Sequence, residues 1–186
     1  QMRSILDQTD FTKLLDHSNC FPRNMYRLYH KFGWCKGDYL ESWFGDALQQ
    51  ITGNSDITFK QAFEKTQKTI VITSSDLTLG EIVYMSHETT PDLPIKVAVR
   101  RSTSLPFVFK PNADVDHINN ITRCYVDGGL LDNYPIDYFD KILEHPEQMV
   151  GFKTMTTLEL EKITNPYIDT DHPNYPSDLR DITLRL

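Results

Sequence analysis

The residues best suited to chemistry form the stretch Asp127-Gly128-Gly129, which directly follows a short apolar segment, residues 124–126. An aspartate at the carboxyl end of a strand lies where open α/β sheets place their ligand crevices. The two glycines leave the backbone free to turn sharply and let a substrate come close to the carboxylate. An isolated Asp-Gly pair is more often an ordinary turn. The context of Asp127 must therefore decide between a functional site and a turn.

Other candidate residues carry weaker signals. The 6 histidines are scattered without an HExxH motif or paired spacing, so we assign them no catalytic or metal-binding role. The 3 cysteines are an odd count without a CxxC pair, which indicates neither a disulfide framework nor a zinc site. Asp76 fits a structural hydrogen-bonding role in a turn. Four serines lack glycine neighbours, so capping or loop hydrogen bonds explain them better than nucleophilic chemistry: Ser74, Ser75, Ser102 and Ser104.

Composition and charge limit the class of protein. The chain has 186 residues, 39% of them hydrophobic and 24% charged, as in an ordinary globular domain. Its formal charge of -7 repels nucleic acid, so we expect no nucleic-acid partner. Its apolar runs are far shorter than the roughly 20 residues of a membrane-spanning helix. The cysteine usage favours a reducing compartment, so we expect the protein to be cytoplasmic or peripheral to membranes.

Two helices are predicted in the first third of the chain. Apolar residues spaced i, i+3, i+4 and i+7 predict one face of a short helix over residues 22–33. The same period continues through residues 40–51, where Asp38 and Glu41 resemble a capping box at the helix start.

Helices and strands alternate further along the chain. Thr58 and Gln61 form a second capping-box pattern, and they predict the start of a third helix. β-branched and apolar runs predict strands at residues 69–73 and 82–85, with a polar turn over residues 74–81.

The remaining elements complete an α/β pattern. A short helix is expected from Pro94 to about residue 102, and a strand at residues 124–126 leads into the Asp-Gly-Gly turn. Pro135 opens a further predicted helix, residues 149–154 could form a last strand, and residues 165–181 lose all periodicity. This alternation predicts an α/β class with a mixed or parallel sheet and helices on its faces.

Four stretches in this order resemble the patatin-like phospholipase family: residues 57–59, 70–81, 97–106 and 125–135. The resemblance spans about residues 56–152 and is most specific around Asp127. It implies a three-layer α/β/α sheet with helices on both faces, incomplete at its N-terminal side. Residues 1–155 would form a partial patatin-like domain, and residues 156–186 a C-terminal extension, loop or surface arm.

The resemblance also implies an activity. Family members hydrolyse acyl esters of phospholipids or related lipids with a serine-aspartate dyad, without a catalytic histidine, metal or cofactor. Asp127 matches the aspartate of the dyad, the proton acceptor, and Gly128 and Gly129 match the glycines of its motif. The expected partners are a lipid or phospholipid substrate and, as a further candidate, a peripheral membrane surface.

The sequence departs from the family in one decisive respect. It contains no GxSxG motif for the nucleophile, since Gly53-Asn54-Ser55 begins the pattern and then fails, and it has no Gly-rich oxyanion loop. We therefore expect the chain alone to be inactive, with the missing N-terminal half of the domain encoded upstream, as a start at Gln1 suggests. Such a chain should expose apolar surface and a sheet edge. The alternative is a non-catalytic lipid-binding or interaction module that has lost its nucleophile. A smaller departure is Arg101, where the family often has a small residue.

Overall fold

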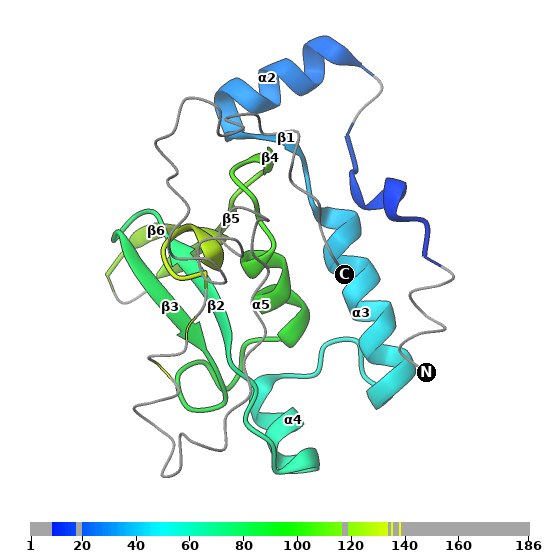
Figure 1. Cartoon of the computed structure of the whole chain (residues 1–186), viewed down its shortest axis with the longest axis vertical. Coiled ribbons are helices and arrows are strands. Elements are labelled where there is room, and N and C mark those ends of the chain that lie inside the picture. Colours follow the sequence, from blue (N-terminus) through cyan, green and yellow to red (C-terminus); the bar gives the residue numbers. More distant parts are fainter. Residues whose placement is uncertain (1–8, 18–19, 117–118, 134, 136–137, 139–186) are drawn as a thin grey trace, which may run out of the picture. The chain divides into compact units, whose positions relative to one another are not determined.

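The computed structural model describes residues 9–17, 20–116, 119–133, 135 and 138 (Figure 1). The chain divides into two compact units, residues 1–135 and 136–186, and every described helix and strand lies in the first. The predicted helix after Pro135, the predicted strand at residues 149–154 and the tail lie outside the described residues. The described elements are, in chain order, the 3-10 helix η1 (Phe11–Leu14), α2 (Phe21–Lys31), β1 (Gly33–Cys35), α3 (Asp38–Thr52), α4 (Phe59–Thr66), β2 (Ile72–Asp76), β3 (Glu81–Met85), α5 (Ile95–Ser102), β4 (Phe107–Phe109), β5 (Asn112–Asp116), β6 (Ile121–Asp127) and the 3-10 helix η2 (Gly128–Leu130).

The main sheet has four strands in the order β3-β2-β6-β5, and every neighbouring pair is antiparallel. A separate parallel pair joins β1 to β4. Helix α5 packs on β2 and β6, and α3 packs in turn on α5. This arrangement of helices on strands confirms the α/β class. The register of β2 on β6 sets Ser74 opposite Asp127, so the central strands meet at the candidate functional residue.

Strand β2 lies three residues later than predicted, over Ile72–Asp76 instead of residues 69–73. The turn was expected to begin at Ser74, but the strand continues through Ser75 to Asp76. All three side chains are 0% exposed, because β2 lies between β3 and β6. A buried hydroxyl needs a partner, and Ser74 Oγ donates to the carbonyl of Val126 at 2.8 Å. Hydrogen bonding to the neighbouring strand therefore lets polar residues occupy a central strand.

Two apolar clusters hold the unit together. The larger one joins α4, β3 and α5, and the smaller one lies where β1, α3 and β4 meet. No helix in the described part of the chain is both long and apolar enough to cross a bilayer. The buried residues of the larger cluster are Ile57, Phe59, Ala62, Met85, Ile95 and Ala98, and those of the smaller one are Cys35, Leu40 and Phe109.

The capping box at the start of α4 is confirmed. Thr58 Oγ1 accepts from Gln61 N at 3.3 Å, and Gln61 Oε1 accepts from Thr58 N at 3.2 Å.

The start of α3 differs from its prediction. Asp38 does not cap the helix, because the N-cap residue is Gly37, whose φ of 82° is in the left-handed region. The carboxylate of Asp16, 21 residues earlier, accepts from Gly37 N at 2.7 Å and from Asp38 N at 2.8 Å. It also accepts from Tyr39 N at 3.3 Å. A distant side chain thus satisfies amides that the sequence assigned to a local cap.

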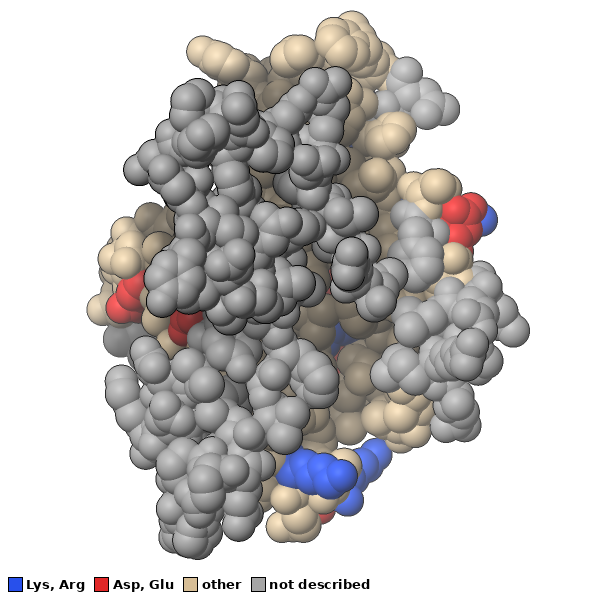
Figure 2. Space-filling view, viewed as in Figure 1, with Lys and Arg blue, Asp and Glu red and all other residues tan. Residues whose placement is uncertain are grey.

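Helix α2 forms where it was predicted, but much of its apolar face is exposed. The buried residues are the polar Asn24 and Arg27, and Arg27 Nη1 donates to the carbonyl of Trp34 at 2.7 Å. Tyr29 is 78% exposed and Phe32 is 63% exposed. Figure 2 shows the visible side of α2, at the top of the view, without Lys, Arg, Asp or Glu atoms. An amphipathic helix usually turns its apolar face to the core, so this orientation is unusual.

Candidate active site

The candidate site begins where β6 ends. Asp127 is the last residue of the strand and the N-cap of η2. Its Oδ1 accepts from Gly129 N at 2.8 Å, and its own amide donates to the carbonyl of Ser104 at 3.0 Å. The side chain is partly exposed, and within the described part of the chain it forms no ion pair. Backbone contacts on both sides therefore hold a carboxylate that remains accessible.

The first of the two glycines after Asp127 is required by space, and the second lies close to two side-chain oxygens. Neither has a positive φ. A Cβ at Gly128 would lie 2.4 Å from Thr73 Oγ1 and 2.7 Å from the carbonyl oxygen of Thr73. A Cβ at Gly129 would lie 2.8 Å from Asn133 Oδ1 and 3.1 Å from Asp127 Oδ1. Any larger residue would thus press on β2 at the first position and on the carboxylate at the second.

The neighbouring serines of β2 support the backbone of the motif. Ser74 Oγ donates to the carbonyl of Val126, and Ser75 Oγ donates to the carbonyl of Gly128 at 3.4 Å. Both side chains are 0% exposed. Among the described residues, no serine hydroxyl donates to the carboxylate of Asp127. These contacts agree with the structural role expected for the two serines.

The buried Arg100 binds Ser104, the residue whose carbonyl accepts from the amide of Asp127. Arg100 is 3% exposed and donates through Nη1 to Ser104 Oγ. Its Nη2 donates to the carbonyls of Lys36 at 2.6 Å and Lys110 at 2.9 Å. Burial lowers the pKa of Arg100 from its ordinary value, and acidic side chains near the start of α3 act in the opposite direction. Sequence reasoning missed this residue, because its partners lie 64 and 10 positions away.

Asp76 has the structural role that the sequence favoured. Its side chain is 0% exposed and forms an ion pair with Arg123 Nε. Arg123 Nη2 also contacts Glu81 Oε1 at 2.9 Å. The Oδ1 of Asp76 accepts from Thr78 N at 2.7 Å and from Leu79 N at 3.3 Å. These contacts fix the β2–β3 turn and give both carboxylate oxygens of Asp76 a partner.

Arg101, the departure from the family pattern, packs across the edge of the sheet. It is 5% exposed, and its Nη2 lies 2.7 Å from Asp114 Oδ2. Its Nε donates to Asn112 Oδ1 at 3.2 Å. The guanidinium lies over the ring of Tyr125, 4.1 Å from the ring centroid, as in a cation–π contact. The large side chain therefore joins α5 to β5 and β6.

Exposed apolar residues follow the motif. Leu130 is 53% exposed and Leu131 is 52% exposed. Val126, which is 0% exposed, alternates with Asp127 along β6 and so points to the opposite face of the sheet. Two half-exposed leucines thus follow the motif along the chain.

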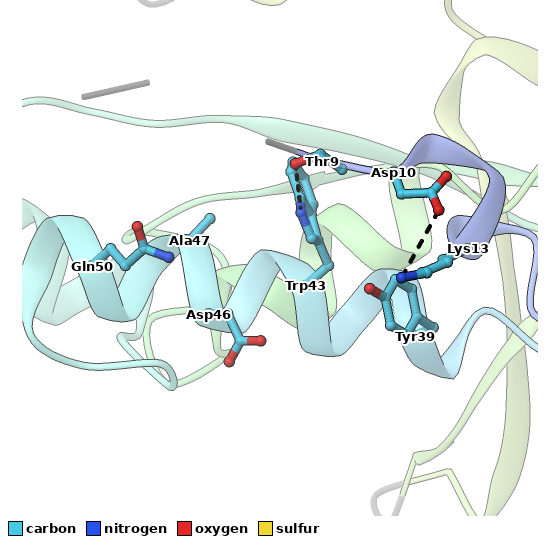
Figure 3. Close-up of a pocket in the computed structure, with 8 residues that line it drawn as sticks. All are labelled: Thr9, Asp10, Lys13, Tyr39, Trp43, Asp46, Ala47 and Gln50. Atoms are coloured by element: carbon cyan, nitrogen blue, oxygen red, sulfur yellow. Dashed lines mark hydrogen bonds and ion pairs between the residues drawn. The ribbon is translucent and has the colours of Figure 1, made fainter. Parts of the chain in front are cut away.

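A pocket of about 250 Å³ lies elsewhere, between η1 and α3 (Figure 3). Trp43 Nε1 donates to Thr9 Oγ1 at 3.1 Å, and Lys13 Nζ lies 3.9 Å from Asp10 Oδ2. The pocket shares no residue with β6 or η2. The described residues contain no group of three or more His, Cys, Asp or Glu that could hold a metal ion. The pocket is lined by Thr9, Asp10, Lys13, Tyr39, Trp43, Asp46, Ala47 and Gln50.

Comparison with known proteins places these observations in context. The sequence model of the patatin-like phospholipase family matches residues 1–140. A protein of Invertebrate iridescent virus 6, named probable lipid hydrolase 463L, is 29% identical over 132 residues, which cover 68% of this chain and 43% of that protein. The uncharacterized protein YqhO of Bacillus subtilis (strain 168) is 31% identical over 160 residues, 78% of this chain and 51% of YqhO.

A third relative is the uncharacterized protein R571 of Acanthamoeba polyphaga mimivirus. It is 32% identical over 119 residues, which cover 64% of this chain and 37% of R571. The chain thus spans about half the length, or less, of each of these relatives.

Proposed function

Because the chain belongs to the patatin-like phospholipase family, we propose that the complete protein hydrolyses acyl esters of lipids and that Asp127 accepts the proton of its serine nucleophile. One observation carries the proposal for Asp127. Its backbone is fixed through Ser104, its Oδ1 is oriented by Gly129 N, and its side chain remains partly exposed without a competing cation among the described residues.

The proposed reaction has two steps. The serine oxygen attacks the acyl carbonyl carbon while Asp127 takes the hydroxyl proton, and the ester bond breaks as the alcohol leaves with that proton. Water then attacks the carbonyl carbon of the acyl-serine while the same carboxylate takes its proton; the bond to the serine oxygen breaks, the serine recovers that proton, and the fatty acid leaves. The serine would come from residues outside these 186, because the sequence contains no GxSxG motif.

The test is ester hydrolysis by the full-length protein with Asp127→Asn. The amide keeps the size of the side chain but cannot accept the proton, so kcat should fall by about 100-fold to 10,000-fold. Asp92→Asn is the matched control, because Asp92 is an exposed aspartate away from the motif. Melting curves would show that both variants are folded. Unchanged turnover of Asp127→Asn would remove Asp127 from the mechanism.

A non-catalytic lipid-binding module is the competing proposal, and the missing GxSxG motif is the observation that favours it. A fluorophosphonate probe, which labels activated serines, separates the two. Labelling of a serine in the full-length protein, lost or slowed in Asp127→Asn, supports the hydrolase. A full-length protein that binds lipid, resists the probe and hydrolyses no ester supports the binding module.

A further inference from the structure

Helix α2 presents an aromatic stripe to solvent. Four of its aromatic or sulfur-containing side chains are exposed, and Phe32 at its C-cap extends the stripe. At about 100° per residue, the four side chains within the helix share roughly 140° of its circumference. The polar residues that face the protein occupy the opposite arc. The exposed fractions are 63% for Phe21, 44% for Met25, 63% for Tyr26, 78% for Tyr29 and 63% for Phe32.

The charges of α2 differ in sign from those of the whole chain. The chain carries 26 acidic and 19 basic residues, whereas the helix carries Arg23, Arg27 and Lys31 and no acidic residue. Arg23, His30 and Lys31 are exposed, and Arg27 is buried. Arg23 and His30 fall beside the aromatic stripe on the helix circumference. An exposed apolar face therefore has a basic border.

The orientation of the helix is set by specific contacts. Arg27 donates to the carbonyl of Trp34 at 2.7 Å, and the rings of Phe21 and Trp34 meet edge to face with centroids 5.7 Å apart. Asn24 is 2% exposed. These contacts attach the polar side of α2 to β1. The outward position of the aromatic stripe is thus part of the folded structure.

We propose that α2 docks on the surface of anionic lipid aggregates, with its aromatic stripe at the boundary between head groups and acyl chains. Phenol rings suit this boundary because the ring is apolar and the hydroxyl stays hydrated. The basic border complements lipid phosphates, which attract cations but repel a chain of net charge -7 elsewhere. The choice of lipid as the partner rests on the proposed function.

The test is co-sedimentation of the full-length protein with two kinds of vesicle, phosphatidylcholine alone and phosphatidylcholine with about 30% phosphatidylserine. The phosphatidylserine gives the second kind a negative surface potential. Tyr26→Ser with Tyr29→Ser should lower affinity for anionic vesicles at least about tenfold, because two exposed rings no longer enter the interface. Leu77→Ser with Leu79→Ser is the matched control, since these residues are 50% and 51% exposed in the β2–β3 turn.

A charge variant tests the basic border. Arg23→Gln should lower affinity for anionic vesicles about fivefold and change affinity for neutral vesicles little. Lys60→Gln with Lys68→Gln, both exposed and outside α2, should leave binding unchanged. Hydrolysis of a soluble, monomeric ester should be normal in every α2 variant, whereas Asp127→Asn should bind vesicles normally. Failure of the docking proposal and failure of the hydrolase proposal are therefore distinct.

Two results would overturn the docking proposal. In the first, both α2 variants bind anionic vesicles as tightly as the unaltered protein. In the second, the protein ignores vesicles and is a dimer in solution that the tyrosine changes convert to a monomer, which would assign the stripe to a second copy of the chain.

Discussion

Replacement of Gly128 by alanine should destabilise the fold through a clash with β2. The new Cβ would lie 2.4 Å from Thr73 Oγ1 and 2.7 Å from the carbonyl oxygen of the same residue. Cβ atoms are essentially never found closer than 3.0 Å to such atoms, so one segment must move by about 0.6 Å. Because the carbonyl belongs to a central strand, the side chain of Thr73 cannot relieve the whole clash by rotating.

The expected cost follows from this geometry. Overpacking a filled interior typically costs about 1–3 kcal/mol, and the backbone contact places Gly128→Ala in the upper part of that range. For a folded unit of this size the melting temperature should fall by roughly 5–10 °C. Thermal and urea unfolding followed by circular dichroism would measure both quantities.

Two further variants separate steric clash from a general effect of glycine replacement. Gly45→Ala should be neutral or stabilising by up to about 1 kcal/mol, because Gly45 lies inside α3 and its Cβ would come close only to the flexible Lys96 side chain, at 3.3 Å, with Ser55 at ordinary contact distances of 3.7 and 3.8 Å. In a Thr73→Ala background, Gly128→Ala should cost less, since the hydroxyl contact is gone and the carbonyl contact remains. A Gly128→Ala melting temperature within 1 °C of the unaltered protein would refute the reasoning.

Two other perturbations test the buried charge and the buried thiol. Arg123→Gln leaves the fully buried Asp76 without its cation, so the free energy of unfolding should fall by about 3 kcal/mol in urea titrations at pH 7. Glu81→Gln removes only the exposed partner of Arg123 and should cost less than about 1 kcal/mol. Equal effects of the two changes would show that the Asp76–Arg123 pair is not the source of the stability. Burial raises the pKa of the Cys35 thiol, so the unfolded chain releases that proton at a lower pH than the folded protein does. The free energy of unfolding should therefore decline as pH rises above about 8.5, the ordinary pKa of a cysteine in an unfolded chain, and should decline less in Cys35→Ala. In the native protein a thiol reagent should modify the exposed Cys20 long before Cys35, and rapid native labelling of Cys35 would contradict its burial.

The helices were predictable where local chemistry determines them. The reciprocal hydrogen bonds of Thr58 and Gln61 form between residues three positions apart, so the sequence contains all the information that the start of α4 requires. The start of α3 depends instead on Asp16, whose carboxylate reaches amides 21 to 23 residues later. No local pattern marks such a contact, and the wrong prediction of an Asp38 cap reflects this.

The strands were predictable only where they are apolar. The pattern found β3 and the centre of β6, but placed the end of β2 too early, because Ser74 to Asp76 have the composition of a turn. Their hydrogen bonds to β6 and the ion pair with Arg123 compensate their burial, and both partners lie about 50 residues away. The polar edge strand β5 was missed for the same reason, whereas β1 and β4 were missed because three residues are too few to show a strand pattern.

The candidate site was predictable in part. Asp127 and its two glycines are adjacent in sequence, so their motif is visible there, and the close approach of Thr73 now explains why the first glycine is needed. The residues that hold the backbone of the motif in place, Ser104 and Arg100, could not be predicted from the sequence. Ser104 accepts from Asp127 through its backbone carbonyl, and two of the three partners of Arg100 are also backbone carbonyls, which carry no signature of residue type.

The hydrogen bonds of Arg100 to three separate segments limit how the loops around it can change in length. One guanidinium spans the end of β1, the end of α5 and the residue after β4, and Gly37 leaves it room, since a Cβ there would lie 2.2 Å from the guanidinium. Insertions or deletions between residues 103 and 110 would pull a carbonyl or hydroxyl out of reach of a side chain of fixed span.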